Sequence, residues 1–248
     1  MQRLRVRFGR GEQVKFISHL DIMRFWERAF RRAEIPLVYS QGFSPHPRIL
    51  LAAPLPVGVT SEFELMDVWL ERWMPPESFL MAVTEQLPAG FEIFELWDVA
   101  LHLPSLQSML AFSEYHVGIK TEKKEQEIQD CLDSLLQVKQ LPWHHSRGEE
   151  VRSYDLRALI DSLWLISYHS EPLTSRVIAV SQSSERSEEE AKQSHIVQDE
   201  PGERPMCILG MRLMCDTTGS GRPEQVVSAL SFSDYPEFIH RTKLILKQ

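Results

Sequence analysis

The chain has 248 residues, of which 43% are apolar and 25% are charged. This composition is ordinary for a soluble globular protein, and the length suits one large domain or two small ones. Three scattered cysteines exclude a disulfide framework and the clustered thiolates of an iron–sulfur centre. Because no apolar run approaches about 18 residues and the first residues lack a signal-peptide core, we expect a cytoplasmic protein without membrane contact.

Charge is distributed unevenly along the chain. The formal net charge is −8, but residues 1–60 contain ten Lys or Arg against four Asp or Glu, a net charge of +6 that leaves −14 for the remainder. A basic end on an acidic body predicts a localised anion-binding face. The alternative is that these arginines only solvate a helix.

The first elements are a strand and a two-faced helix. Residues 3–8 alternate arginine with apolar side chains, which predicts a strand with one buried face and one wet, cationic face. Residues 14–17 are expected to extend or return this strand. A helix follows from Ser18, which can cap it together with Asp21. One helix face is apolar, and Glu27 partly neutralises the other, which carries Arg24, Arg28, Arg31 and Arg32.

The remaining elements predicted within the first hundred residues are four strands and one helix. Proline 36 ends the helix, and strands are predicted at residues 37–39, 48–53 and 62–71, with a rigid turn at 41–47. A helix then begins at Pro75-Pro76, and a last strand covers residues 91–99. Strand, helix, strand pair, helix, strand is the order of the ferredoxin-like βαββαβ fold, which we predict for residues 1–100.

The pattern restarts over residues 108–248, less regularly. Strands are predicted at residues 112–119, 151–154, 163–166, 174–180, 207–215 and 240–246, and helices at 122–137 and 223–230. Residues 155–163 suit one or two helical turns. The acidic, polar residues 183–205 predict a mobile loop or insertion. The predicted fold class is therefore α+β, with two ferredoxin-like halves built on antiparallel sheets.

The basic helix and the following turn form the main candidate site. Arginine donates in a planar arrangement to phosphates, and exposed aromatic rings can stack on unpaired bases whose edges amides and hydroxyls read. The alternative interpretation places Phe43 in the core and Tyr39 in a strand. The predicted nucleic-acid-binding residues are Arg24, Arg28, Arg31, Arg32, Tyr39, Gln41, Phe43, His46 and Arg48.

Two weaker candidate sites remain. His19 and His46 are the natural acid–base pair for a metal-free ribonuclease, although each also suits a local structural role. The loop before the last predicted helix could hold an anion through its backbone N–H groups, or be an ordinary turn; its residues are Gly219, Ser220, Gly221 and Arg222. His144 and His145 are adjacent and would point apart in a regular element, so we expect neither a metal nor another cofactor.

Several motifs are similar to those of one bacterial family. These are SHLD (18–21), RAFRRAEIP (28–36), YSQGFSPHPRI (39–49) and PLPVGV (54–59), followed by DLRALI (155–160), SGRPEQVV (220–227) and IHRTKL (239–244). They resemble the uncharacterised radical SAM-linked, or radical SAM-associated, proteins of bacteria. The resemblance implies a radical SAM protein as partner and an RNA context by association, and it carries over no catalytic residues.

A weaker likeness is to the RAMP proteins, which are RNA-processing proteins built from ferredoxin-like domains. The helix with HL near its start and RR near its end, followed by GFSPHP, carries this likeness, but their C-terminal glycine-rich loop has no clear copy here. We therefore expect a binding module rather than an enzyme, working with a radical SAM protein and binding RNA or an RNA-linked substrate. A metal-free RNA endonuclease and a partner that binds only protein are the alternatives.

Overall fold

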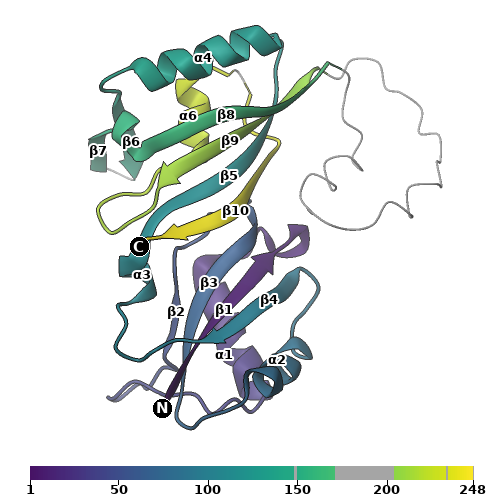
Figure 1. The fold of residues 1–248 in the computed structure, drawn as a ribbon, viewed down its shortest axis with the longest axis vertical. Coiled ribbons are helices and arrows are strands. Elements are labelled where there is room, and N and C mark those ends of the chain that lie inside the picture. The colour runs from purple at the N-terminus through teal and green to yellow at the C-terminus, as the bar shows by residue number, and fades with distance from the viewer. Residues whose placement is uncertain (148–149, 171–203, 233, 248) are drawn as a thin grey trace, which may run out of the picture.

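A computed structural model describes residues 1–147, 150–170, 204–232 and 234–247 (Figure 1). The N-terminal elements are β1 (Gln2–Arg10), α1 (His19–Arg32), β2 (Ile49–Leu51), β3 (Thr60–Leu70), α2 (Pro76–Thr84) and β4 (Phe91–Asp98). The later ones are α3 (Leu106–Met109), β5 (Leu110–Lys120), α4 (Glu125–Gln137), β6 (Pro142–Arg147), β7 (Glu150–Asp155), β8 (Ile160–His169), β9 (Met206–Met214), α6 (Pro223–Ala229) and β10 (Phe238–Leu246).

The predicted fold class is confirmed. One sheet of eight strands has the order β4-β1-β3-β10-β5-β9-β8, with β2 paired to β3. The segment β4-β1-β3-β2 is the antiparallel order of a ferredoxin-like unit, and β10-β5-β9-β8 repeats it with α4 and α6 as its helices (Figure 1). The repeat arises because apolar residues alternate along each strand and recur at helical spacing between the strands.

The strands of the two halves form one continuous sheet. β3 and β10 pair in parallel at Thr60–His240 and Ser61–Arg241. The helices of both halves pack on the same face of this sheet. Glu64 shares its side of β3 with buried Met66, and it contacts Arg241 on the helix-covered side of β10. The predicted boundary between residues 100 and 108 lies in the connection from β4 to β5, and a division into separate domains stays a prediction.

Three local predictions differ from the structure. Residues 14–17 do not form a strand, because a short 3-10 helix (Glu12–Val14) and a turn place Val14 in the core of the first half. Residues 37–39 make only isolated bridges, Leu37 to Leu70 and Tyr39 to Pro47. Strand β6 was not predicted, and it pairs with β7 as a separate hairpin.

The predicted strand at 174–180 and most of the predicted loop at 183–205 fall on residues 171–203, outside the described residues. The two residues that follow 171–203 contact the second half. Arg204 Nη1 lies 2.7 Å from Asp234 Oδ2, and the Pro205 carbonyl accepts a hydrogen bond from Thr121 N. None of the helices in the described ranges is long and apolar enough to span a membrane.

The predicted wet, cationic face of β1 is wrong. Arg3 and Arg5 are 2% and 4% exposed, because the connection from β4 to α3 covers this side of the sheet. Apolar residues of α3, of neighbouring strands and of the segment after β2 form a third core cluster, which includes Leu65, Leu106 and Leu110. The sheet is therefore covered on both faces around Arg3 and Arg5.

Candidate nucleic-acid interface

Helix α1 places its predicted arginines in solvent. Ser18 Oγ accepts a hydrogen bond from Asp21 N and donates one of 2.7 Å to Asp21 Oδ2, which fixes the helix start. The pKa of Asp21 lies below its ordinary value of 3.8, chiefly because of this Ser18 donor and also because of the positive charges on Arg24 and Arg28. The apolar face, with Trp26 at its centre, is buried against the sheet.

The exposed side of α1 is only partly neutralised. Arg24 pairs with Asp21 at 3.3 Å, and Arg32 Nη2 donates to the Gln86 carbonyl at 3.3 Å. Arg28 and Arg31 are exposed, and neither makes an ion pair with any residue that the structure describes; Glu27, which was expected to neutralise this face in part, pairs with neither. This helix therefore presents guanidinium groups that are available to an external anion.

The segment from Tyr39 to Arg48 is an exposed loop with a fixed base. Ser40 N donates to the His46 carbonyl at 2.8 Å, and His46 N donates to Ser40 Oγ at 3.0 Å. Gly42 has a φ of 128°, which favours glycine at the tip. Phe43 is fully exposed and Tyr39 is 43% exposed, so the interpretation of Phe43 as a core residue is wrong.

The nine predicted binding residues fall on two parts of the surface. Arg48 lies over the Trp69 ring at 4.3 Å, and Arg3 lies 5.1 Å from the same ring. Trp69 points away from the face on which α1 packs, because its neighbour Val68 belongs to the core beneath α1. Arg48 is therefore on the sheet side opposite to the α1 arginines.

The structure does not bring His19 and His46 together. His19 is the first residue of α1, which starts beside the C-terminal end of β1. The loop that holds His46 follows a bridge from Leu37 to Leu70 at the opposite end of β1, whose nine residues span about 30 Å. This separation contradicts an acid–base pair made of these two residues.

The predicted anion-binding loop already contains an anion of the chain. Asp216 Oδ1 accepts hydrogen bonds from Thr218 N at 2.8 Å and from Gly219 N at 3.2 Å. Gly221 N donates to the Met214 carbonyl. The pKa of Asp216 is lowered, chiefly by the hydrogen bond from the Thr218 hydroxyl. The N–H groups of Gly219 and Gly221 are therefore occupied within the chain, and anion binding by Gly219, Ser220, Gly221 and Arg222 stays a prediction.

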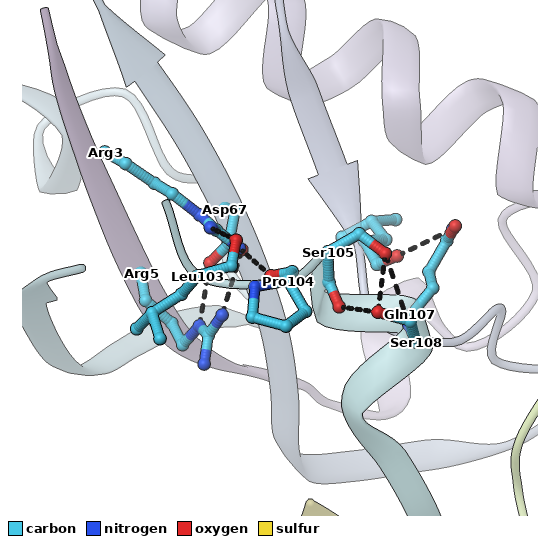
Figure 2. Close-up of polar contacts among 9 residues, drawn as sticks. Arg3, Arg5, Asp67, Leu103, Pro104, Ser105, Gln107 and Ser108 are labelled. Atoms are coloured by element: carbon cyan, nitrogen blue, oxygen red, sulfur yellow. Dashed lines mark hydrogen bonds and ion pairs between the residues drawn. The ribbon is translucent and has the colours of Figure 1, made fainter. Parts of the chain in front are cut away.

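The best-connected polar cluster was not predicted as a site. Figure 2 shows Arg3 and Arg5 converging on Asp67, which is fully buried. Arg3 Nε and Arg5 Nε donate to the two Asp67 oxygens at 3.0 and 2.8 Å, and Arg3 also donates to the Leu103 and Pro104 carbonyls. The signal that could have revealed it is an aspartate within residues 65–70 (LMDVWL), which are otherwise apolar.

The family comparison agrees with the bacterial part of the motif resemblance. Residues 3–192 match the family described as an uncharacterized protein conserved in bacteria, DUF2344. The chain belongs to this family. No curated protein matches it. Among solved structures, it is similar at 6% identity and a TM-score of 0.43 to a chain of a "Crystal Structure of a Cbf5-Nop10-Gar1 Complex", over 98% of this chain and 48% of that one.

Within the described ranges, no three His, Cys, Asp or Glu side chains lie close enough together to hold a metal ion. His144 Nδ1 lies 2.8 Å from Ser153 Oγ, and burial raises the pKa of the Cys207 thiol to about 12. A thiol with so high a pKa remains protonated at neutral pH, which makes it a poor nucleophile and a poor metal ligand.

Proposed function

We propose that this chain is a non-catalytic RNA-binding module that presents RNA, or a substrate linked to RNA, to a radical SAM protein. The observation that carries the RNA part is the exposed row of arginines on α1, of which Arg28 and Arg31 have no ion-pair partner among the described residues. Guanidinium groups in such a row match the spaced phosphates of a nucleic-acid backbone. The partner part rests on the motif resemblance alone.

The distribution of the other basic residues supports this choice. Arg3 and Arg5 form ion pairs with the buried Asp67, and Arg10 is only 3% exposed. Arg7 pairs with Glu95, and Lys15 pairs with Glu12. Among the basic residues of positions 1–60, the positive charge that remains for an external ligand is thus concentrated on α1 and Arg48. An acidic body next to this face orients a polyanion towards it.

The test is the binding of a labelled single-stranded RNA, followed by fluorescence anisotropy over a range of salt concentrations. The variant Arg28→Gln/Arg31→Gln/Arg32→Gln should bind at least tenfold more weakly than the wild type. Its salt slope should fall by about 2, since each phosphate contact to a single strand contributes about 0.7.

The matched control is Lys124→Gln/Lys139→Gln/Lys243→Gln, which removes the same charge from exposed positions of the second half. It should retain most of the affinity. Unchanged binding in the arginine variant, or an equal loss in both variants, would overturn the proposal.

A second function, binding a protein and no RNA, is favoured by the loop tip. The fully exposed Phe43 ring, held on a hydrogen-bonded loop, is of the kind that fills a pocket in a protein partner. If this is the function, Phe43→Ser should abolish co-purification with the radical SAM protein after nuclease treatment. The RNA affinity of the same variant should remain that of the wild type.

A further inference from the structure

A cavity of about 340 Å³ lies where the two halves meet. Its wall combines the ends of β1, β3 and β4 with His240 from the start of β10, so both halves contribute to it. Gly9, Gly11 and Gly90 form part of the wall. This volume is within the range of small-molecule sites.

His240 gives the cavity wall an unused polar atom. The residue is 5% exposed, and its Nδ1 lies 2.8 Å from Thr60 Oγ1. Its Nε2 has no hydrogen-bond partner among the described residues, and the closest carboxylate oxygen, Glu62 Oε2, is 4.0 Å away. A buried imidazole nitrogen without a partner costs free energy that a bound polar ligand would recover.

The charges around the cavity select the kind of ligand. Glu12, Glu62 and Glu92 line it, and only Glu12 has a lysine partner, Lys15, at 2.6 Å. Arg10 is the one arginine in the lining, and its Nη2 group is directed to the Val14 and Ile17 carbonyls.

The Phe94 ring adds a partly exposed aromatic surface to the same wall. Two unpaired carboxylates beside an aromatic ring complement a positive charge, because carboxylates accept charge-assisted hydrogen bonds and the ring face attracts cations.

We propose that this cavity binds a small organic cation that carries an ammonium or guanidinium group. Glu62 and Glu92 accept its N–H groups, and Phe94 lies against the cationic centre. In the tautomer with its proton on Nδ1, donated to Thr60 Oγ1, His240 accepts a further N–H at Nε2. Such a ligand would bridge the two halves, and the site does not depend on RNA binding.

The probe is agmatine, which carries one ammonium and one guanidinium group, with inorganic phosphate as the anionic comparison. Calorimetry should give a Kd below about 1 mM for agmatine. The variant Glu62→Gln/Glu92→Gln should raise that Kd at least tenfold. In ¹H–¹⁵N spectra of the wild type, the His240 ring signals, assigned by their absence in His240→Asn, should shift on addition of agmatine.

The control is Glu77→Gln/Glu85→Gln, which removes two exposed carboxylates from α2 and its C-terminal end and should leave the Kd unchanged. Equal weakening in both double variants would show attraction to overall negative charge and overturn the site. So would unmoved His240 signals at saturating agmatine, or tighter binding of phosphate. RNA affinity of Glu62→Gln/Glu92→Gln should stay at the wild-type value, which separates this test from that of the RNA proposal.

Discussion

Asp67 is the residue on which the covered side of the first sheet depends. It is fully buried and accepts hydrogen bonds from Arg3 and Arg5, so one carboxylate compensates two guanidinium groups. The carbonyls of Leu103 and Pro104 also accept hydrogen bonds from the Arg3 guanidinium group (Figure 2). Through these bonds the connection from β4 to α3 is attached to β1, which brings the second half back against the first.

Replacing this carboxylate should be costly. Asp67→Asn leaves two buried arginines without a counter-charge, and breaking a buried ion pair typically costs about 3–5 kcal/mol. Urea denaturation should show a loss of unfolding free energy in this range. The control Glu95→Gln removes the 58% exposed partner of Arg7 and should cost less than about 1 kcal/mol. Equal effects of the two substitutions would contradict the role of Asp67.

At the scale of the element, α1 illustrates how much a helix depends on its cap. Ser18→Ala removes the side chain that accepts from Asp21 N and should destabilise the chain by about 1 kcal/mol. It should also raise the pKa of Asp21 towards 3.8, since the Ser18 hydrogen bond is the main cause of its lowering. NMR titration of the Asp21 carboxyl group measures the pKa directly.

The lowered pKa of Asp21 determines how its contribution to stability changes with pH. A carboxyl group with a lowered pKa in the folded state stabilises the fold above its ordinary pKa, and this contribution disappears as the pH falls through the folded value. The contribution of Asp21 is therefore present at neutral pH and lost in acid. Ser228→Ala, which changes an exposed serine of α6, should leave the Asp21 titration unchanged; a shift there would argue against a local cause.

The sheet of the second half depends on a glycine in β9. A Cβ atom at Gly210 would lie 2.0 Å from the Trp164 ring of the neighbouring strand, so Gly210→Ala must displace this indole. We expect a loss of about 1–3 kcal/mol in urea denaturation, together with a shift in tryptophan emission. Gly11→Ala should be nearly neutral, because Gly11 has a φ of −84° and an added Cβ would come tightly against only the flexible end of the Gln13 side chain, with the Gly90 backbone at ordinary contact distance.

For the whole molecule, the sequence predicted the secondary structure, which depends on residues close together in the chain. It did not predict the contacts that arise only when distant strands pair. Alternating and helical spacing placed most strands and helices, and so both ferredoxin-like halves. The same alternation could not show that Arg3 and Arg5 face Asp67, which is more than 60 positions away in the sequence. The exposed arginines of α1 were predictable from helical spacing, whereas the cavity beside His240 depends on the β3–β10 pairing.

That pairing carries one buried ion pair, between Glu64 of β3 and Arg241 of β10. Arg241 Nη1 donates to both Glu64 oxygens at 3.0 and 3.2 Å, and its other nitrogens donate to the Tyr115 hydroxyl and the Pro54 carbonyl. Both charged side chains are nearly inaccessible to water. The pair therefore joins the helix-covered sides of the two halves.

Glu64→Gln should cost about 3–5 kcal/mol, because it leaves the Arg241 guanidinium buried without a counter-charge. Since the sheet is continuous, hydrogen exchange should accelerate in β3 and in β10 together. The double variant Glu64→Leu/Arg241→Met removes both charges and should recover most of the loss, because apolar residues of similar volume often replace a buried ion pair at no cost. A Glu64→Gln protein that loses less than about 1 kcal/mol, or whose exchange accelerates only in β3, would show that the two halves are stabilised independently of this contact.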